Sequence, residues 1–386
     1  MGAANWDRRR AQESDLKVWS AGILPALSAN KILRNLHSEQ IQRVVVRVPN
    51  WVGDAVMAVP ALRELRRVLP HARITLVSRP GSADIFVDAD FADEVLVYDR
   101  TSLASAWHQA REWRRRQFDL ALLFQNAFEA AAIAFMARIP TRIGYNTERR
   151  GLLLTSSLPL PAWKNERHES FYYLNIIGEL ERLLSGKQTE TAEPLFDLHV
   201  SEDRKRKALS FLRERGARLN APLTILCPGS INSRAKRWPA ERYAELADRL
   251  AKSGSDVALI GSPAELDISN EVCRHARSQP IVLTGETSVA EATAIISIAD
   301  VLITNDTGPA HIGAALQTPT LVIFGPTNPL TTFPMSPGTE IIRSAPDCAP
   351  CMLRDCPIDH RCMTAISAEE VFERASIMMS QPEVIA

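Results

Sequence analysis

The feature that most constrains this chain is a repeated alternation of short β-branched runs with helix-like segments. The first run covers residues 43–48, where Arg-Val-Val-Val-Arg-Val predicts a strand buried in a parallel sheet. A helix is predicted at 54–68, and a second strand follows at 73–77. Strands that alternate with helices in this way predict right-handed βαβ units and an open parallel sheet.

The alternation occurs twice along the chain. In the first half the remaining predicted strands are 94–98, 118–124 and 142–145, with helices at 103–116 and 127–138. In the second half the predicted strands are 224–227, 256–260, 281–283, 301–304 and 320–324, with helices at 240–253, 264–277, 288–298 and 308–316. A polar run at 185–194 that ends in proline separates the halves, as a linker does.

A chain of 386 residues is long enough for two domains. The predicted fold class is therefore α/β, with two Rossmann-like domains that face each other across a cleft. We expect an N-terminal extension at 1–40 with a weakly amphipathic stretch at 16–36, a first domain at 41–195 and a second domain at 196–386. Ligands of such sheets bind outside the carboxyl ends of the strands, so the loops after the strands are the places to search.

Charge and hydrophobicity exclude several classes of protein. Lys plus Arg and Asp plus Glu both number 45, and this balance argues against broad nucleic-acid binding, which needs excess positive charge. No stretch approaches the roughly 18 apolar residues of a membrane-spanning helix. Residues 1–20 mix Arg, Asp and Glu where a secretory signal needs an apolar core. We therefore expect a cytoplasmic protein, which could still contact a membrane surface from the inside.

The loop after the first strand, at residues 49–54, ends in Gly53 and Asp54 at the start of a predicted helix. Asp54 has two interpretations. It could cap the helix, because an Asp side chain accepts hydrogen bonds from the first free N–H groups. It could instead face the cleft as a general base.

Two loops of the second half could hold a phosphorylated ligand. Ser230 follows a strand, and Lys236 lies within a run of three cations before the next helix, an arrangement that suits a phosphate or a solvated loop. Glu265 begins a helix after another strand, where it could accept hydrogen bonds from ribose hydroxyls or simply favour the helix start.

The most informative loop is the run Asn305-Asp306-Thr307-Gly308-Pro309-Ala310-His311. It places several N–H groups and a hydroxyl at a strand-to-helix junction, which is a ready site for a diphosphate. Pro309 fits the first helical turn, where its missing N–H costs nothing. The chain has neither a Walker motif nor a G-x-G-x-x-G fingerprint after a strand, which disfavours a kinase or a nicotinamide enzyme.

Taken together, these motifs resemble one known family. The matching runs are Val48-Pro49-Asn50-Trp51-Val52-Gly53-Asp54, Ser230 with Lys236-Arg237-Trp238-Pro239, the run 305–311, and Phe324-Gly325-Pro326-Thr327. They resemble the ADP-heptose:lipopolysaccharide heptosyltransferases of glycosyltransferase family 9, and the first run is most similar to heptosyltransferase II. The resemblance covers about residues 42–375. It implies a GT-B fold with an acceptor-binding first domain and a donor-binding second domain.

The resemblance also implies a reaction. A heptose would pass from ADP-heptose, with inversion, to a lipid-linked anionic acceptor, the lipopolysaccharide inner core at the inner membrane surface. Asp54 would be the catalytic base. The donor would contact Ser230, Lys236, Glu265, Asp306, Thr307, Gly308 and His311, and the acceptor would contact Asn50, Trp51, Arg63 and Arg67. Two alternatives stay open: a GT-B transferase or epimerase that uses another nucleotide sugar, and a non-catalytic nucleotide-sugar-binding protein.

Four of the six cysteines are close together in sequence, at Cys348, Cys351, Cys356 and Cys362, with His360 nearby. Clustered cysteines in a protein expected to be cytoplasmic favour metal binding or reduced thiols over disulfides. Their spacing differs from the paired C-x2-C motifs of a zinc ribbon. A structural metal, free thiols and a disulfide therefore remain open, and the implied reaction requires no cofactor.

Overall fold

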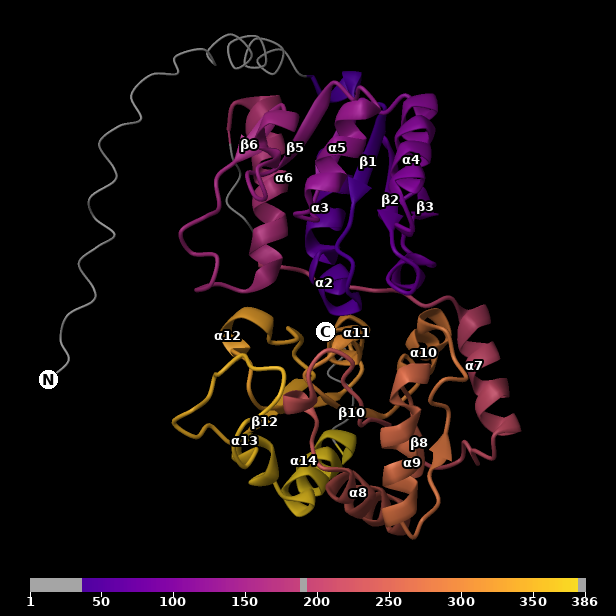
Figure 1. The fold of residues 1–386 in the computed structure, drawn as a ribbon. Helices are drawn as coiled ribbons and strands as arrows, with labels where there is room; N and C mark the ends of the chain where they lie inside the picture. The colour runs from indigo at the N-terminus through magenta and orange to yellow at the C-terminus, as the bar shows by residue number, and fades with distance from the viewer. Residues whose placement is uncertain (1–36, 188–192, 381–386) are drawn as a thin grey trace, which may run out of the picture.

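In the computed structural model, described for residues 37–187 and 193–380, the chain forms two parallel sheets of six strands each (Figure 1). The first sheet contains β1 (Arg43–Arg47), β2 (Arg73–Ser78), β3 (Glu94–Val97), β4 (Leu120–Leu123), β5 (Thr141–Tyr145) and β6 (Ser156–Leu158). The second contains β7 (Leu223–Cys227), β8 (Asp256–Leu259), β9 (Ile281–Val282), β10 (Val301–Asn305), β11 (Thr320–Phe324) and β12 (Thr339–Arg343). The predicted α/β class with two parallel sheets is confirmed.

Helices connect the strands within each half. In the first half they are α2 (Val52–Met57), α3 (Val59–Val68), α4 (Leu103–Arg116), α5 (Phe128–Met136) and α6 (Glu169–Ser185), with short 3-10 turns η1 (Ser38–Gln40), η2 (Ala83–Phe86) and η3 (Arg150–Leu153). In the second half they are α7 (Glu202–Glu214), α8 (Ala240–Lys252), α9 (Leu266–His275), α10 (Val289–Ile296), α11 (Gly308–Ala315), α12 (Pro329–Thr332), α13 (Arg361–Thr364) and α14 (Ala368–Ser380), with turns η4 (Arg234–Lys236) and η5 (Pro263–Glu265).

The two sheets have the same topology. The strand order is β3-β2-β1-β4-β5-β6 in the first sheet and, read from its other edge, β9-β8-β7-β10-β11-β12 in the second. In each sheet the chain first adds strands toward one edge and then returns to the middle to add strands toward the other edge. The change occurs between β1 and β4 in the first sheet and between β7 and β10 in the second. A crevice opens at such a switch point, outside the carboxyl ends of the two strands. The topology therefore predicts one ligand-binding crevice in each half.

Strand β1 shows why the β-branched run predicts a buried strand. Val45 is paired in register with Thr75 of β2 and with Ala121 of β4. Val44 and Val46 point into one hydrophobic cluster, and Val45 points into another on the opposite face. Since both faces are covered, every side chain in the middle of the strand is apolar, as in other central strands of parallel sheets.

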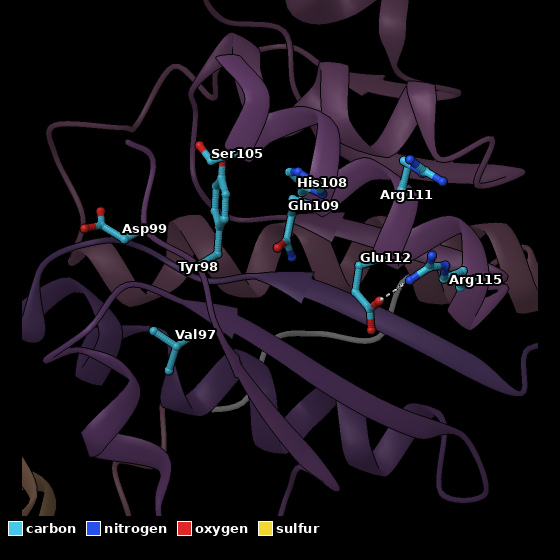
Figure 2. A pocket seen from close by; sticks show the side chains of 9 residues that line it. All are labelled: Val97, Tyr98, Asp99, Ser105, His108, Gln109, Arg111, Glu112 and Arg115. Carbon is cyan, nitrogen blue, oxygen red and sulfur yellow. Dashed lines mark ion pairs between the residues drawn. The ribbon is translucent and has the colours of Figure 1, made fainter. Parts of the chain in front are cut away.

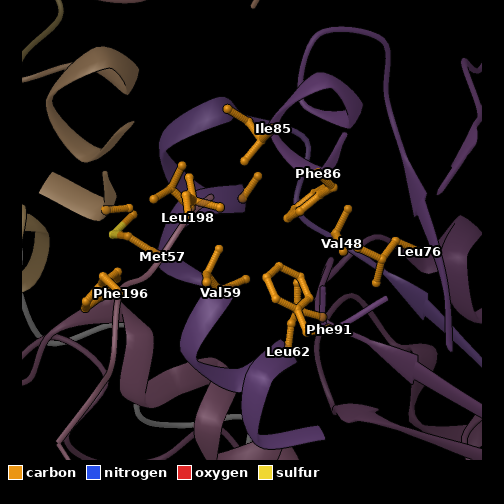
Figure 3. Packing of buried hydrophobic residues seen from close by; sticks show 14 of the residues in the cluster. Val48, Met57, Val59, Leu62, Leu76, Ile85, Phe86, Phe91, Phe196 and Leu198 are labelled. Atoms are coloured by element: carbon orange, nitrogen blue, oxygen red, sulfur yellow. The ribbon is translucent and has the colours of Figure 1, made fainter. Parts of the chain in front are cut away.

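The larger core cluster extends beyond the first sheet. Figure 3 shows Phe196 and Leu198, from the segment that leads to the second domain, near Met57 at the end of α2. The Leu198 amide donates to the carbonyl of Ala315 at the end of α11. The connecting segment is thus held against both halves. The predicted boundary between residues 195 and 196 stays a prediction.

One predicted helix is divided in two. We expected a single helix at 54–68, but α2 ends at Met57 and α3 begins at Val59. Pro60 is the cause, because it lacks an N–H and its ring clashes with the backbone one turn earlier. It is tolerated in the first turn of α3, where its missing N–H has no partner to lose.

Two strands and five helices were not predicted: β6, β12, α6, α7, α12, α13 and α14. The strand β6 has only three residues and two of them are serines, so it lacks an apolar run. The strand β12 carries charged residues at Glu340 and Arg343 and follows a Pro-Gly turn. Edge strands can be this polar because only one side is paired.

Part of the predicted organisation lies outside the described residues. This applies to residues 1–36 of the extension, with the amphipathic stretch at 16–36, to residues 188–192 of the linker, and to residues 381–386 of the predicted second domain. Within the described part of the chain, every helix is too short or too polar to span a bilayer.

Candidate active site

The loop that carries Asp54 and the loop at 305–308 meet where α2 faces α11, between the two sheets (Figure 1). A Cβ atom added to Gly53 would lie 3.0 Å from Cδ2 of His311. A Cβ atom added to Gly308 would lie 3.0 Å from Cγ1 of Val52. A glycine on each helix therefore allows the two N-terminal turns to approach this closely. The structure brings together two motifs that are more than 250 residues apart in sequence.

Asp54 lies in the first turn of α2, but it does not cap that helix. The N-cap residue is Trp51, and no side chain accepts a hydrogen bond there. The capping interpretation of Asp54 is therefore wrong. Its half-buried carboxylate accepts no hydrogen bond from the described part of the chain, so both oxygens are available to an incoming group.

The surroundings of Asp54 raise its pKa to about 6. Burial is the largest cause, since it disfavours the charged form, and the nearby carboxylate of Glu169 adds to the rise. Lys164 and Lys236 oppose it. Lys236 belongs to the second domain, so the electrostatic environment of Asp54 comes from both halves of the chain. A carboxylate with a pKa near neutral is suited to accept a proton.

Sequence reasoning missed two charges near Asp54: Lys164, in the segment before α6, and Glu169, the first residue of α6. Lys164 Nζ lies 2.7 Å from Glu169 Oε1, and the same ammonium is 4.3 Å from the centre of the Tyr172 ring. His168, between them in sequence, hydrogen-bonds through Nε2 to the carbonyl of Phe333 at 2.9 Å. Burial lowers the pKa of His168 to about 4. The sequence signal was a dense run of charges between a strand and a helix.

On the second domain, Lys236 and Asp306 form an ion pair. Lys236 Nζ lies 2.8 Å from Oδ2 of Asp306 and also donates to the Asp306 backbone carbonyl at 3.0 Å. Thr327 Oγ1 donates to the same carboxylate oxygen at 2.6 Å. Asp306 is almost completely buried, at 3% side-chain exposure, whereas Lys236 keeps 26%. Asp306 therefore holds Lys236 in place and leaves part of its ammonium accessible.

Asn305 joins the loops of the second domain. Its side-chain NH2 group donates to the carbonyls of Pro228 and Gly229, at 2.9 and 3.1 Å. Its Oδ1 accepts from the Trp238 amide at 3.1 Å and from the Tyr243 hydroxyl at 3.2 Å. All four hydrogen-bonding positions are used, so this buried amide fixes the ends of β7 and β10 relative to each other. The motif contained Asn305, but sequence reasoning gave it no role.

The remaining predicted donor residues surround this pair of loops. Ser230 is buried, and its carbonyl accepts two hydrogen bonds from the Arg237 guanidinium. Thr307 is the N-cap residue of α11, with no capping hydrogen bond from its side chain. His311 is buried, and burial lowers its pKa to about 4, so its ring is neutral at neutral pH.

Glu265 stabilises the start of a helix, which was the simpler of its two interpretations. Its Oε2 accepts from the amide and the hydroxyl of Ser262, both at 2.8 Å, in a capping box. Its other oxygen lies against Gly229, where a Cβ atom would be only 2.2 Å away. Glu265 thus lies beside the loop that follows β7, and a contact with ribose stays a prediction.

The predicted acceptor residues are in two different places. Asn50 and Trp51 directly precede α2; Asn50 accepts from the Arg47 guanidinium at 2.9 Å, and Trp51 is 58% exposed. Arg63 is paired with Asp197 at 2.9 Å. Arg67 is paired with Glu64 and Glu181 on α3 and α6. The two arginines therefore join structural elements, whereas the two loop residues lie next to Asp54.

The four clustered cysteines are free thiols whose exposure falls from Cys348, which is exposed, to Cys362, which is buried. Burial raises the pKa of Cys362, and the other three cysteines lie near enough to add to the rise. In the described part of the chain, the sole set of three potential metal ligands within 4.8 Å of one another is Glu241, Glu271 and His275. Binding of one ion by the four thiols would therefore require them to move closer together.

The segment that carries the cysteines packs directly on the loop of Lys236. The Ala235 amide donates to the Arg354 carbonyl at 2.9 Å, and His360 Nε2 lies 2.6 Å from the Ala235 carbonyl. The Met352 amide donates to the carbonyl of Pro326 at 2.9 Å, next to the threonine that binds Asp306. The cysteine segment thus positions the predicted donor loop.

Comparison with known proteins identifies similar sequences. A sequence profile described as glycosyltransferase family 9 (heptosyltransferase) matches residues 106–361. The lipopolysaccharide heptosyltransferase 2 of Salmonella typhimurium is 30% identical over 315 residues, which cover 78% of this chain and 88% of that protein. The lipooligosaccharide heptosyltransferase 2 of Haemophilus ducreyi is 29% identical over 311 residues, with the same coverage.

Solved structures show the same similarity. The structure of E. coli ADP-heptose lps heptosyltransferase II aligns with a TM-score of 0.76 at 25% identity and covers 88% of this chain and 98% of that one. A glycosyl transferase family 9 structure from Veillonella parvula aligns with a TM-score of 0.75 at 24% identity and covers 88% and 97%. The expected GT-B architecture is therefore confirmed.

Proposed function

The chain belongs to glycosyltransferase family 9, and from this membership we propose how its site transfers a heptose from ADP-heptose to the inner core of lipopolysaccharide. The relatives named as heptosyltransferase 2 support this donor and this acceptor over another nucleotide sugar and over a non-catalytic binding role. The transfer inverts the anomeric centre, as the resemblance to the family implies.

Asp54 is the proposed base. Its free carboxylate, its pKa of about 6 and its position opposite the N-terminus of α11 are the observations that carry this proposal. Asp54 takes the proton from an acceptor hydroxyl while the hydroxyl oxygen attacks the anomeric carbon. ADP leaves from the opposite face of the sugar, which accounts for the inversion.

The second domain holds the donor. The diphosphate lies at the N-terminus of α11, where the first N–H groups of the helix, Gly308 among them, point outward. The Thr307 hydroxyl and the accessible part of the Lys236 ammonium add a donor and a charge, which stabilise ADP as it leaves. Ser230 borders the phosphates, Glu265 accepts from the ribose, and Asp306 and His311 set the geometry of the loop.

The first domain holds the acceptor. Asn50 and Trp51 lie beside Asp54 and are the proposed first contacts with the sugar. Arg63 and Arg67 stay proposed contacts for acceptor phosphates, reached only if they exchange their present carboxylate partners. The acceptor carries a lipid, so we also propose that the enzyme works from the cytoplasm at the inner membrane surface.

The transfer itself is proposed to need no cofactor, and the cysteine segment is proposed to have a structural role. A zinc or iron ion held by Cys348, Cys351, Cys356 and Cys362 would fix this segment against the loop of Lys236. Elemental analysis of the purified protein decides this point. Stoichiometric zinc or iron supports the metal, and its absence rules the metal out.

The decisive experiment compares wild type with Asp54→Asn. We expect the variant to bind ADP-heptose as wild type does, because the donor contacts come from the other domain. We expect transfer to fall by at least about 100-fold, since general base catalysis contributes roughly 10²–10⁴-fold. Donor affinity is measured by calorimetry and transfer by release of ADP. A variant that transfers at the wild-type rate would refute Asp54 as the base.

A further inference from the structure

The outer face of α4 lies between two open hollows that are separate from the candidate active site. Figure 2 shows the first, of about 650 Å³, between α4 and the end of β3, where it includes Tyr98 and His108. The second, of about 550 Å³, lies between α4 and the end of α5 and includes Trp107 and Met136. No predicted donor or acceptor residue lines either hollow. This face therefore has no role in the proposed chemistry.

Arginines form the ridge between the hollows. Arg111 and Arg115 line both, so they project from the outermost line of the helix. Arg114 lines the second hollow. All three are exposed. In the described part of the chain, Arg111 and Arg114 have no carboxylate within ion-pair distance, and Arg115 has only Glu112, at 3.9 Å. The ridge thus carries positive charge that the protein does not neutralise.

Large apolar side chains accompany these charges. Of the four aromatic residues among the exposed large hydrophobic side chains of the described chain, three are on α4 and α5: Trp107, Phe128 and Phe135. Leu103, at the start of α4, is 81% exposed, and Met136 is 38% exposed. Leu103, Trp107, Arg111 and Arg114 are spaced three or four residues apart, so they lie along one side of the helix. Buried residues of α4 (Ala106, Ala110 and Trp113) face the core instead.

Arginine beside exposed tryptophan is a combination that suits a lipid headgroup layer. Arginine binds phosphate through paired N–H groups, and tryptophan places its apolar ring and its N–H at the boundary between headgroups and acyl chains. Both helices begin where β3 and β4 end, at the carboxyl edge of the sheet from which the Asp54 loop also starts. From there the helices run to the opposite edge of the sheet, so Leu103 lies near the edge that carries the base, whereas Arg114, Arg115 and Met136 lie near the far edge. A membrane along this face would therefore lie beside the first domain, with the Leu103 end nearest to the Asp54 loop.

We propose that the α4–α5 face, formed by Leu103, Trp107, Arg111, Arg114, Arg115 and Met136, docks on the anionic phospholipid surface that holds the acceptor. The inference rests on the proposed function, because it is the lipid of the acceptor that requires the enzyme to approach a membrane. The arginines bind headgroup phosphates, while Trp107 and Leu103 insert at the headgroup boundary.

Vesicle binding tests the docking without any catalysis. We expect wild type to sediment with vesicles of phosphatidylglycerol and phosphatidylethanolamine, less so as salt rises, and not with pure phosphatidylcholine. Neutralising three arginines, in Arg111→Gln/Arg114→Gln/Arg115→Gln, should weaken binding by about 100-fold, since each basic residue near such a surface contributes about fivefold. Trp107→Ala should weaken it further.

A matched control makes the same charge change on the other domain. Lys252→Gln/Arg274→Gln/Arg277→Gln also removes three exposed cations, from the second domain. We expect it to bind vesicles as wild type does. Equal loss in both triple variants would overturn the proposal, because the effect would then reflect net charge alone. A change in oligomeric mass of the α4 variants with unchanged vesicle binding would also overturn it, in favour of a contact between copies of the chain.

Activity with two acceptors separates this inference from the proposed function. The α4 variants should transfer to a deacylated, soluble core acceptor at the wild-type rate and lose transfer to the acceptor embedded in vesicles. Equal transfer by variant and wild type to the embedded acceptor would refute the docking face. If wild type transfers to neither acceptor, the proposed function fails, while the vesicle measurement still reports on docking.

Discussion

A single carboxylate, Asp54, receives its properties from residues of both halves. Burial and Glu169 raise its pKa to about 6, and Lys236, from the second domain, lowers it. Had Asp54 capped its helix, hydrogen bonds from backbone amides would have stabilised its charged form and lowered the pKa. Because Trp51 occupies the cap position instead, the carboxylate stays basic enough to take a proton.

The pH dependence of the reaction should report this pKa. A base acts only when it is deprotonated, so kcat/KM should rise about tenfold per pH unit below pH 6 and level off above it. Steady-state rates with the soluble acceptor between pH 4.5 and 8 would give the profile. In Glu169→Gln the inflection should move to lower pH, because a charge that raises the pKa is removed. A rate that stays constant between pH 5 and 7 would contradict the assignment.

Lys236 should contribute to stability as well as to donor binding. Lys236→Met leaves the buried Asp306 carboxylate without its cation, and breaking a buried pair in this way costs about 3 kcal/mol of unfolding free energy. Adding Asp306→Asn should restore part of the loss, since no buried charge remains. Urea unfolding of the single and double variants measures both effects. An unfolding free energy of Lys236→Met equal to that of wild type would show that the pair is unimportant.

The single residues that sequence reasoning could propose for the site were those within contiguous motifs. Asp54, Lys236 and Asp306 each follow a predicted strand, and the loops after strands are where ligands of such sheets bind. Lys164 and Glu169 were missed because their importance depends on Asp54, more than 100 positions away in sequence. Such a contact exists only after the sheet has formed.

At the scale of elements, the contact between α2 and α11 joins the two halves of the site. It depends on small residues, because Gly308 leaves only enough space for Val52 and Gly53 leaves only enough for His311. Packed helices usually keep their axes 8–10 Å apart. Glycine allows the N-terminal turns to come closer than larger residues would.

A double-mutant cycle should detect this contact. Gly308→Ala places a methyl group 3.0 Å from Cγ1 of Val52 and should cost about 1–3 kcal/mol of unfolding free energy. Val52→Gly removes both Cγ1 and the Cβ atom, which would lie 3.1 Å from the new methyl group, so the double variant should be more stable than the sum of the two single effects predicts. Thermal or urea unfolding of the four proteins gives the coupling. Strictly additive effects would mean that the two helices do not touch in solution.

The elements that the sequence predicted correctly are those with an apolar run or a clear period. The helix α4 has the predicted bounds, and the central strands agree within two residues. Polar edge strands such as β6 and the interruption between α2 and α3 were not predicted. The first depends on pairing with β5, and the second depends on the local effect of Pro60. Neither produces a hydrophobic period.

At the scale of the whole molecule, the proposed donor residues and the proposed acceptor residues belong to different sheets. Nucleotide binding should therefore be a property of the second domain, and its specificity can be measured without an acceptor. ADP at 100 times its dissociation constant should stabilise the folded protein by about 2.7 kcal/mol, which raises the melting temperature. UDP and GDP at the same concentration should have little effect. A larger shift with UDP than with ADP would contradict the assignment of the donor.

The identical strand order of the two sheets has a consequence for how such enzymes diversify. Each half has its own switch point, and in the proposed mechanism the two switch points contribute different parts of the reaction. If the proposed division holds, mutations beside the ends of β1 and β4 should change which sugar is extended without disturbing nucleotide binding beside β7 and β10. Chimeras that combine the first sheet of one relative with the second sheet of another should keep the donor and exchange the acceptor.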